Sequence, residues 1–325
     1  MHHDEEISLN AALISNMTIG KVYKESEEQF IGLDFSLDGE LLAAYTSSSL
    51  LIFEVLLAKK KKTLYNKSSG ISHLAFTHHN SAVVFLPAKK PFNLNLWSIH
   101  ENEIIKSFRG GEEIPIKLEI NRKNDLVLTI DSARMIRIYD ISKDQGPIMI
   151  LDLKDQLECA ACFDYSGKNL LVTTALSTPA GLTRLELHNI EDDYKGVSKK
   201  LYLKDRPPVS SVQFDPEGNR VLCVAENGIV FLINLESEIV TELGLNFGAK
   251  IPRPELSFTP DSKFLLAGSE EGVVRVIDIS SKYTEIAKFS GHLKSCLCVK
   301  FSPVSVVFVS ACQTLLFWTP KYWDS

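Results

Sequence analysis

Two pairs of cysteines have the spacing that redox or metal chemistry would need. Cys159 and Cys162 are separated by two residues, as in redox motifs and in half of a zinc site. Side chains alternate along a strand, so residues three apart point to opposite faces. Cys296 and Cys298 are two apart, and we expect them to share a face of an innermost strand, where cysteine is commonly buried. No second pair lies at zinc-finger spacing, so both pairs predict buried thiols.

Histidines, glycines and carboxylates also lack a catalytic pattern. His78 and His79 are adjacent in a predicted turn, where we expect both to be exposed to solvent. "FRGGEE" (108–113) has no lysine-serine pair after its glycines, so it predicts a turn between strands and not a phosphate loop. No Gly-x-Ser-x-Gly motif occurs, and most carboxylates fall in turns, where they are solvated or bond the local backbone. We therefore expect no enzyme activity, no cofactor and no metal.

A run of four lysines, Lys59–Lys62, lies in "LAKKKKTLYNKSSG" (57–70). One interpretation is a nuclear-import element or a contact for an acidic partner. The other is a solvated loop between the third and fourth strands of a first repeat unit. The sequence favours the solvated loop.

The elements that would position these residues follow a repeat. A short apolar segment, a turn and a second apolar segment recur seven times, as in "LDFSLDGELLAAY" and "LSFTPDSKFLLAG". Each copy has an apolar anchor before its turn, and successive anchors lie 41 to 51 residues apart. The anchors are Phe35, Phe76, Ile120, Phe163, Phe214, Phe258 and Phe301. This period is typical of units of four short strands, and seven such units predict a closed β-propeller.

A second landmark follows each anchor by about twenty residues, as a strand that ends in an apolar residue and a polar one. The apolar positions are Phe53, Trp97, Tyr139, Leu187, Ile233, Ile277 and Trp318. Trp97-Ser98 and Tyr139-Asp140 stand where WD repeats have Trp-Asp, and Gly291-His292 matches the other half of that signature. Over about 300 residues the chain resembles the WD-repeat family.

The predicted fold is all-β, a seven-bladed WD-repeat propeller with four antiparallel strands per blade. The last unit ends soon after Trp318 and lacks an outer strand, so we expect the alternating segment 17–26 to pair with it and close the ring. The expected organisation is a flexible tail over 1–16, one propeller over 17–320 and a C-terminal tail over 321–325.

The WD resemblance implies a buried network of His, Ser or Thr, a turn Asp and Trp within each blade. The seventh unit has His292 and Trp318, with Gln313 near the position of the turn Asp. The sixth has Glu271 at that position and no Gly-His. We therefore expect most blades to depend on apolar packing instead.

Composition limits the partners. A net charge of −6 and a pI near 5.8 argue against a dedicated nucleic-acid binder, so no direct sequence-specific contact with nucleic acid is expected. No 18-residue apolar run is present, which predicts no membrane partner. The acidic N-terminus lacks the order of a secretory signal, and six cysteines in 325 residues indicate free thiols in a reducing compartment.

One group of basic residues is a candidate binding site for partners. Loops entering the innermost strands and turns joining second and third strands share one face of a propeller. On the second and third units that face is predicted to carry Lys67, Lys89, Lys90, Arg109 and Arg134. Such a patch on an acidic protein suits an acidic or phosphorylated peptide, although ordinary interspersed surface charge remains an alternative. Opposite, Glu226, Glu270 and Glu271 beside Arg206 and Arg253 predict mixed charge.

A closer resemblance comes from "ELSFTPDSKFLLAGSEEGVVRV" (255–276), "VSACQTLLFWTP" (309–320) and "SIHENEIIKSFRGG" (98–111). With "KKTLYNKSSGISHLAFTH" (61–78), they resemble the WD-repeat subunit of COMPASS histone lysine methyltransferases, a family that also serves in polyadenylation and protein-phosphatase-one termination complexes. Gly111 departs from this family, which has His there.

The resemblance implies a nuclear, non-catalytic adaptor. Its partners would be a methyltransferase subunit, a phosphatase-scaffold or polyadenylation-factor subunit, and the phosphorylated tail peptide of RNA polymerase II. The alternatives are a cytoplasmic scaffold or the substrate receptor of a ubiquitin ligase. A propeller hydrolase or lyase would need paired carboxylates or a metal cluster at the channel mouth, which the sequence does not place there.

Overall fold

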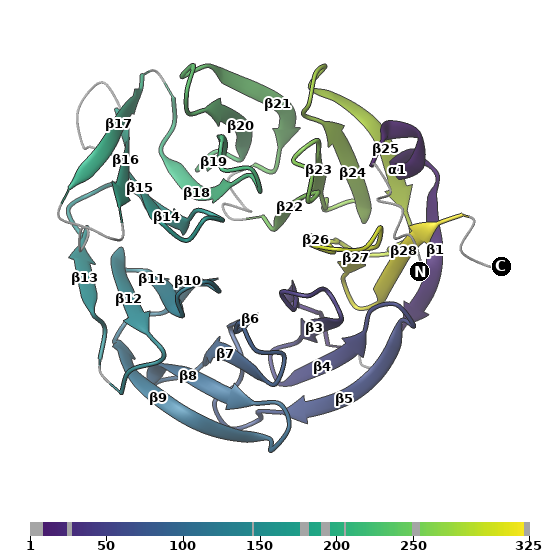
Figure 1. The fold of residues 1–325 in the computed structure, drawn as a ribbon, viewed down its shortest axis with the longest axis horizontal. Helices are drawn as coiled ribbons and strands as arrows, with labels where there is room; N and C mark the ends of the chain where they lie inside the picture. The colour runs from purple at the N-terminus through teal and green to yellow at the C-terminus, as the bar shows by residue number, and fades with distance from the viewer. Residues whose placement is uncertain are drawn as a thin grey trace, which may run out of the picture.

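The computed structural model describes residues 9–24, 28–144, 146–175, 182–189, 196–204, 206–248 and 254–321. These residues form seven four-stranded antiparallel sheets arranged radially around a channel (Figure 1). The predicted seven-bladed propeller is therefore confirmed.

Blades one to six each use four consecutive strands, with the first innermost and the fourth at the rim, and blade seven uses β26, β27 and β28 with β1 at its rim. Blades one to three contain β2 (Gly32–Phe35), β3 (Leu41–Tyr45), β4 (Ser49–Glu54), β5 (Lys59–Tyr65), β6 (His73–Phe76), β7 (Ala82–Leu86), β8 (Phe92–Ser98), β9 (Glu103–Gly111), β10 (Pro115–Asn121), β11 (Leu126–Asp131), β12 (Met135–Asp140) and β13 (Met149–Asp152). Blades four and five contain β14 (Cys159–Phe163), β15 (Asn169–Ala175), β16 (Thr183–Asn189), β17 (Val197–Leu203), β18 (Val209–Phe214), β19 (Arg220–Ala225), β20 (Ile229–Asn234) and β21 (Val240–Asn246). Blades six and seven contain β22 (Leu256–Phe258), β23 (Phe264–Ala267), β24 (Val273–Asp278), β25 (Thr284–Ser290), β26 (Cys298–Phe301), β27 (Phe308–Ala311), β28 (Leu315–Pro320) and β1 (Met17–Tyr23).

The core lies between the blades. Seven apolar clusters each join two neighbouring blades, as where Phe35 and Phe53 of blade one pack with Phe317 of blade seven. Both faces of each sheet are covered, which explains why the inner strands read as nearly continuous apolar runs. The predicted anchors fall at the ends of inner strands, and the second landmarks fall in third strands.

The N-terminal strand closes the ring. β1 pairs antiparallel with β28, from Met17 opposite Pro320 to Tyr23 opposite Leu315, as the sequence predicts. Figure 1 shows the purple β1 beside the yellow β28, so the two ends of the propeller complete one blade.

The sequence predicts a flexible tail over 1–16, but the second half of this segment is folded against the propeller. Ala11–Ser15 form a short helix, α1, whose Asn10 side chain caps it by accepting from the backbone N–H of Leu13. Ile14 is buried in the cluster between blades six and seven, and Ser15 donates to the Ile286 carbonyl. Apolar packing thus orders Ala11–Ser15, which the polar, acidic composition of the N-terminal segment does not predict. Residues 1–8 and 322–325 lie outside the described residues.

Two sequence interpretations of loops are wrong. Lys59–Lys62 form the first half of β5, the outer strand of blade one, and Phe108–Gly111 belong to β9, the outer strand of blade two. An outer strand buries side chains only toward its neighbours and tolerates long polar residues elsewhere, so both segments carry a loop-like composition on a hydrogen-bonded strand.

The cysteines are buried in separate places. Cys159 packs between blades three and four, whereas Cys162 packs between blades four and five, which confirms that they face opposite ways. The expectation that Cys296 and Cys298 share a face is wrong, since they belong to the clusters on either side of blade seven. Regular alternation starts only at Cys298, where β26 begins, while Cys296 bridges to Ser269 of blade six.

Candidate functional site

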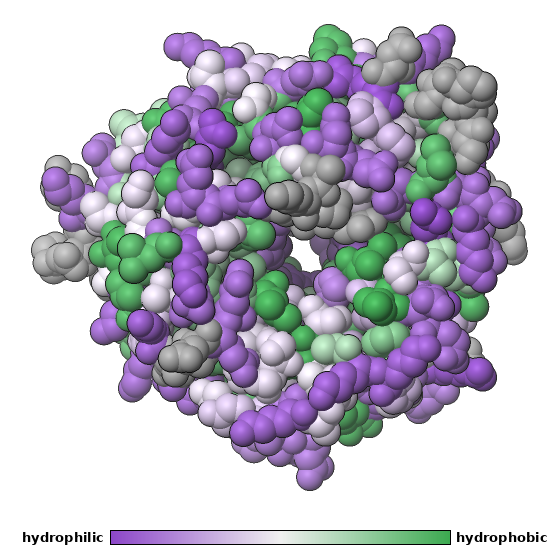
Figure 2. All heavy atoms as spheres, turned by 180° about the vertical axis from the view of Figure 1, so that it is seen from behind, coloured by the Kyte–Doolittle hydropathy of each residue, from purple (hydrophilic) through white to green (hydrophobic). Residues whose placement is uncertain are grey.

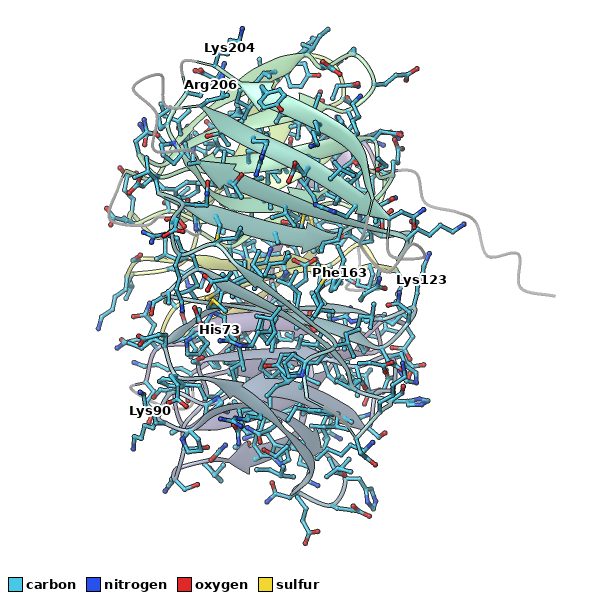
Figure 3. All side chains as sticks on the ribbon, turned by 90° about the vertical axis from the view of Figure 1, so that its left-hand side faces the viewer. His73, Lys90, Lys123, Phe163, Lys204 and Arg206 are labelled. Carbon is cyan, nitrogen blue, oxygen red and sulfur yellow. The ribbon has the colours of Figure 1, made fainter. Side chains whose placement is uncertain are left out.

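One face of the ring gathers the loops that enter the innermost strands and the turns that join second and third strands; we call it the top face. In the side view of Figure 3, Lys90, Lys204 and Arg206 lie toward this face, and Lys123, from a turn between first and second strands, lies toward the other. Figure 2 looks onto the top face and shows the channel opening, with hydrophobic side chains beside it.

The structure brings Lys67, Lys89 and Lys90 together. Lys67 lies in the loop between β5 and β6, and Lys89 and Lys90 lie in the turn between β7 and β8. The backbone N–H groups of Ala88 and Lys89 both donate to the Ser69 carbonyl (3.1 Å each), which joins the loop to the turn. All three lysines are exposed, so they form one basic corner of the top face.

The two arginines are placed differently. Arg134 lies in the turn between β11 and β12, as predicted, and is half-buried. Arg109 lies on the outer strand β9 and points to solvent while its neighbour Phe108 is buried. The five predicted residues therefore form an arc over blades two and three, with Arg109 at its outer rim.

Sequence reasoning missed two carboxylates within this arc. Glu112 and Glu113 follow β9 and are exposed, and Glu112 lies 3.9 Å from the ammonium of Lys90. A pair this exposed contributes little energy, but it lowers the local positive potential. Their position three and four residues after Arg109 would have shown them.

Two apolar side chains also lie on this part of the top face. Ile114 precedes β10 and Leu157 precedes β14, and their exposed fractions are 62% and 49%. The N–H of Ser132 donates to the Ile114 carbonyl (2.8 Å), which fixes this loop against the turn that carries Arg134. Apolar and cationic groups side by side suit a peptide better than a free anion.

The opposite side of the top face has mixed charge, as the sequence predicts. Arg206 pairs with Glu242 (2.8 Å) and lies 5.1 Å from the centre of the Phe231 ring, beside a pocket of about 320 Å³. Glu270 and Glu271 line a second depression of about 440 Å³. Arg253 lies outside the described residues.

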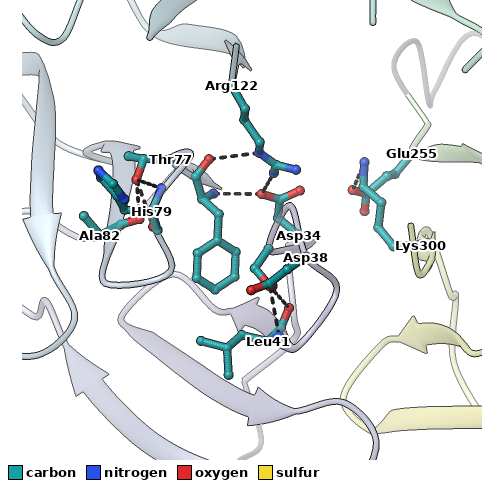
Figure 4. A network of polar contacts seen from close by, with 11 residues as sticks. Asp34, Asp38, Leu41, Thr77, His79, Ala82, Arg122, Glu255 and Lys300 are labelled. Atoms are coloured by element: carbon teal, nitrogen blue, oxygen red, sulfur yellow. Dashed lines mark hydrogen bonds and ion pairs between the residues drawn. The ribbon is translucent and has the colours of Figure 1, made fainter. Parts of the chain in front are cut away.

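Charged side chains also line the channel. Asp34 of blade one accepts hydrogen bonds from the backbone N–H of Phe76 (2.8 Å) and from the guanidinium of Arg122 (Figure 4). Arg122 also donates to the Phe76 carbonyl (3.2 Å). One carboxylate thus links blades one, two and three, whose residues lie up to 88 positions apart.

The bond from Phe76 recurs at other junctions. In each case the residue before one anchor accepts a hydrogen bond from the backbone N–H of the next anchor. The pairs are Phe76 with Asp34 (2.8 Å), Phe163 with Glu119 (2.7 Å), Phe301 with Ser257 (2.9 Å), and Phe214 with the Cys162 thiol. The polar residue before the anchor was visible in the sequence, but its acceptor role depends on the neighbouring blade.

A second channel pair joins blades six and seven. The Lys300 ammonium lies 3.5 Å from the Glu255 carboxylate (Figure 4). Burial against the channel wall raises the pKa of Glu255 to about 7, with the Asp34 carboxylate acting in the same direction and Lys300 opposing it. The other carboxylate oxygen of Glu255 has no hydrogen-bond partner among the described residues.

The raised pKa of Glu255 predicts a pH-dependent contribution to stability. The folded state holds the proton of Glu255 more tightly than the unfolded chain does. The contribution of Glu255 to the free energy of unfolding is therefore fully present below about pH 4.5 and is lost as the pH rises through about 7. We expect Glu255→Gln to remove this dependence. The free energy of unfolding of the variant, measured relative to that of wild type, should rise by about 1–2 kcal/mol from pH 5 to pH 8, since channel water reduces the full effect of the pKa shift. Urea unfolding at both pH values measures it. A Glu255→Gln difference that is the same at both pH values would contradict it.

Blade seven keeps the buried network that the WD resemblance implies, with a changed member. Nε2 of His292 and Nε1–H of Trp318 both bond the Ser310 hydroxyl, at 2.7 and 2.8 Å. Nδ1 of His292 lies 3.1 Å from the Cys312 sulfur and 3.3 Å from the Thr314 hydroxyl. Cys312 and Thr314, on either side of the predicted Gln313, therefore contact the histidine where the turn Asp would. Burial lowers the pKa of His292 to about 4, which keeps it neutral.

Blade three shows how the missing histidine at Gly111 is replaced. A Cβ at Gly111 would lie 2.7 Å from a guanidinium nitrogen of Arg137, which donates to the Asp131 carboxylate at 2.7 Å. The Tyr139 hydroxyl, at the Trp position, donates to the Arg109 carbonyl (3.2 Å). Arg137 thus occupies the space that a histidine side chain at position 111 would fill, and it bonds Asp131, the turn Asp that the histidine would bond.

Within the described part of the chain, no group of three or more His, Cys, Asp or Glu side chains is placed to hold a metal ion. The described helix is too short to span a membrane, and no other candidate span is found among those residues. His79 is exposed as predicted, but His78 is half-buried and pairs with Asp125.

Comparisons with known proteins agree with the repeat. The family model "WD domain, G-beta repeat" matches residues 255–278 and 283–318. "Protein ANTHESIS POMOTING FACTOR 1" of Arabidopsis thaliana is 25% identical and aligns over 98% of this chain and 95% of its own length. "COMPASS component SWD2" of Saccharomyces cerevisiae is 20% identical over 88% of this chain and 89% of its own. The solved Cps50 (Swd1) β-propeller domain superposes with a TM-score of 0.73 over 93% of this chain and 99% of that one, at 11% identity, and shows a shared fold.

Proposed function

Because the chain is a WD-repeat propeller that resembles the Swd-type subunit of COMPASS, we propose that it is a non-catalytic adaptor of a nuclear chromatin or transcription complex. In this role it recruits a COMPASS-type histone lysine methyltransferase, a phosphatase–termination complex, or both, to RNA polymerase II. One observation carries the proposal: similarity to a COMPASS component extends over nearly the full length of both chains.

The top face supports peptide recognition. Its loops present the cations of blades two and three, with the exposed Ile114 beside the turn of Arg134 and Leu157 at the entry to blade four, so a partner segment finds apolar and charged contacts on one face. The ring beneath is closed by β1, and its neighbouring blades are joined along the channel wall, which restricts the movement of these loops.

The adaptor role predicts activity in complexes and none in the isolated chain. The tagged chain, precipitated from nuclear extract, is expected to carry along methyltransferase activity on histone lysines, whereas the purified chain alone transfers no methyl groups. The measurement is transfer of labelled methyl groups to recombinant histones. Activity in the purified chain contradicts a non-catalytic adaptor, and a precipitate without activity contradicts the methyltransferase assignment.

The basic arc is the proposed site for the phosphorylated polymerase tail peptide. We expect Arg109→Glu with Arg134→Glu to weaken binding of a phosphorylated tail peptide by about tenfold or more, because charge-assisted hydrogen bonds to phosphate are lost. Fluorescence anisotropy over a salt series measures affinity and its salt dependence.

Charge-matched controls lie on the other face. Lys123→Glu with Lys263→Glu introduces the same change in net charge in turns between first and second strands, and should leave peptide affinity near wild type. If the arginine variant keeps wild-type affinity and salt dependence, the arc is not the peptide site.

A further inference from the structure

The outer strand of blade one carries cations that the adaptor role does not use. We propose that the rim of blade one, formed by Lys59, Lys61, Tyr65 and Lys67, binds single-stranded nucleic acid through its backbone phosphates and one stacked base. Lys67 also belongs to the basic arc, but the proposal does not rest on the proposed function.

The strand presents these side chains to solvent along its length. Lys59, Lys61 and Tyr65 are exposed, and Lys67 follows two residues after Tyr65. Lys60 pairs with Phe53 and Lys62 with Ile52, so Lys61 is the extra residue of a β-bulge. A bulge re-aims its side chain, and here it leaves Lys61 pointing outward. The seven residues of β5 span about 23 Å, enough for several nucleotides of an extended strand.

The rim is anchored and only partly neutralised. The Lys62 ammonium donates to the carbonyls of Ile99 and His100, at 2.7 and 2.8 Å, which ties β5 to blade two. Lys61 lies 3.5 Å from Glu54, in a pair whose lysine is half exposed. Among the described residues no carboxylate pairs with Lys59. Lys59, and in part the half-exposed Lys61, therefore remain available to an anion.

Outer strand β17 is a contrast within the same ring. Its lysines Lys199 and Lys200 lie 3.4 Å from Glu238 and 3.3 Å from Glu186. Edge lysines that only prevent strand addition can be neutralised by carboxylates. Both strands carry an exposed tyrosine, Tyr65 on β5 and Tyr202 on β17. Among the described residues, however, β5 leaves Lys59 without a carboxylate partner and places the Lys67 ammonium beside its exposed ring.

Tyr65 makes the rim suited to nucleic acid in particular. Its side chain is 62% exposed, and the Lys67 ammonium lies 5.5 Å from its ring centre. Cations that follow a backbone, together with an exposed ring on which a base stacks, are the usual means of binding single strands without sequence readout. The loop that carries Lys67 also contacts the turn with Lys89, so positive charge continues onto the top face.

The structure argues against the nuclear-import interpretation of Lys59–Lys62. A signal of that kind must be free to bind in extended form, whereas this backbone is paired with β4 along its length. An acidic peptide remains the chemical competitor, and stacking on Tyr65 separates the two, since carboxylate side chains have no ring to stack.

The test is binding of fluorescein-labelled 12-mers of single-stranded RNA and DNA to the full chain, by anisotropy at 50 to 300 mM salt. We expect salt-dependent binding that Lys59→Glu with Lys61→Glu weakens by about tenfold or more, with a smaller salt slope because two phosphate contacts are lost. Tyr65→Ala should weaken binding by roughly five- to a hundredfold without changing that slope. The RNA and DNA arms show which strand is preferred.

Lys200→Glu is the matched control, because Lys200 is as exposed as Lys61 on an equivalent strand; it should bind like wild type. Circular dichroism of each variant shows that the fold is kept. The proposal is overturned by binding that Tyr65→Ala leaves unchanged, by equal affinity for a glutamate 12-mer, or by no binding at 50 mM salt.

Discussion

Deletion of residues 1–23 is expected to abolish the folded propeller. The deletion removes β1, so six residue pairs with β28 are lost, and β28, which still pairs with β27, becomes an exposed edge strand. It also removes Ile14 and Met17 from the cluster between blades six and seven, each worth about 1.5–3 kcal/mol of apolar burial. Together with the lost ladder, this approaches the whole stability of a typical protein.

Circular dichroism, urea unfolding and gel filtration measure this effect. We expect a chain that aggregates or unfolds without a cooperative transition. Deletion of residues 1–8 is the control, since it removes none of the described contacts and should keep the wild-type midpoint. A cooperative transition near the wild-type midpoint after deletion of residues 1–23 would show that the ring does not need its N-terminal closure.

The second large effect is expected for Asp34→Ala. This change leaves the Phe76 N–H and the Arg122 guanidinium without their shared acceptor on the channel wall. Removing one partner of a buried pair costs about 3–5 kcal/mol, and contact with channel water reduces this to about 2–3 kcal/mol. Urea unfolding measures the loss.

A double-mutant cycle with Arg122→Met isolates the pair. Because the two side chains interact directly, the double variant should lose clearly less than the two single losses combined. Asp34→Asn should recover part of the stability, since its amide oxygen still accepts from Phe76. Additive losses, or a loss below about 0.5 kcal/mol for Asp34→Ala, would contradict the role of Asp34 as a link between three blades.

Much of the fold could be predicted from sequence because the repeat is local. Each unit places its anchor at the end of an inner strand buried on both faces, and the anchor's spacing to the next landmark is set by two short strands and a tight turn. Phe258 and Ile277 follow this rule in blade six even though Ile277-Asp278 replaces Trp-Asp. Spacing therefore predicts the ring where the motif itself has diverged.

The outer strands β5 and β9 were not predicted from the sequence, for a physical reason. Only the side chains that face a neighbouring blade are buried there, so Lys59–Lys62 and Phe108–Gly111 look like loops although their backbones are paired. The same lack of constraint hides α1, whose burial depends mainly on Ile14 and its place against blade six.

The candidate site depends on contacts between distant residues. Lys67 and Lys89 could be assigned to one face from topology, but Glu112, which follows the end of β9, also lies on that surface and pairs with Lys90. Two further contacts arise from packing that one sequence does not reveal. Arg137 fills the space beside Gly111 where a histidine side chain would lie, and Cys312 contacts His292.

Quantitative mass spectrometry of the affinity-purified, tagged chain is the most direct test of the adaptor account. The account predicts enrichment from nuclear extract of COMPASS-type methyltransferase subunits, of phosphatase–termination and polyadenylation subunits, or of both, together with RNA polymerase II. The recovery of polymerase should fall in the Arg109→Glu, Arg134→Glu variant. Enrichment of ubiquitin-ligase core subunits from cytoplasmic extract, with none of these nuclear proteins, would contradict it.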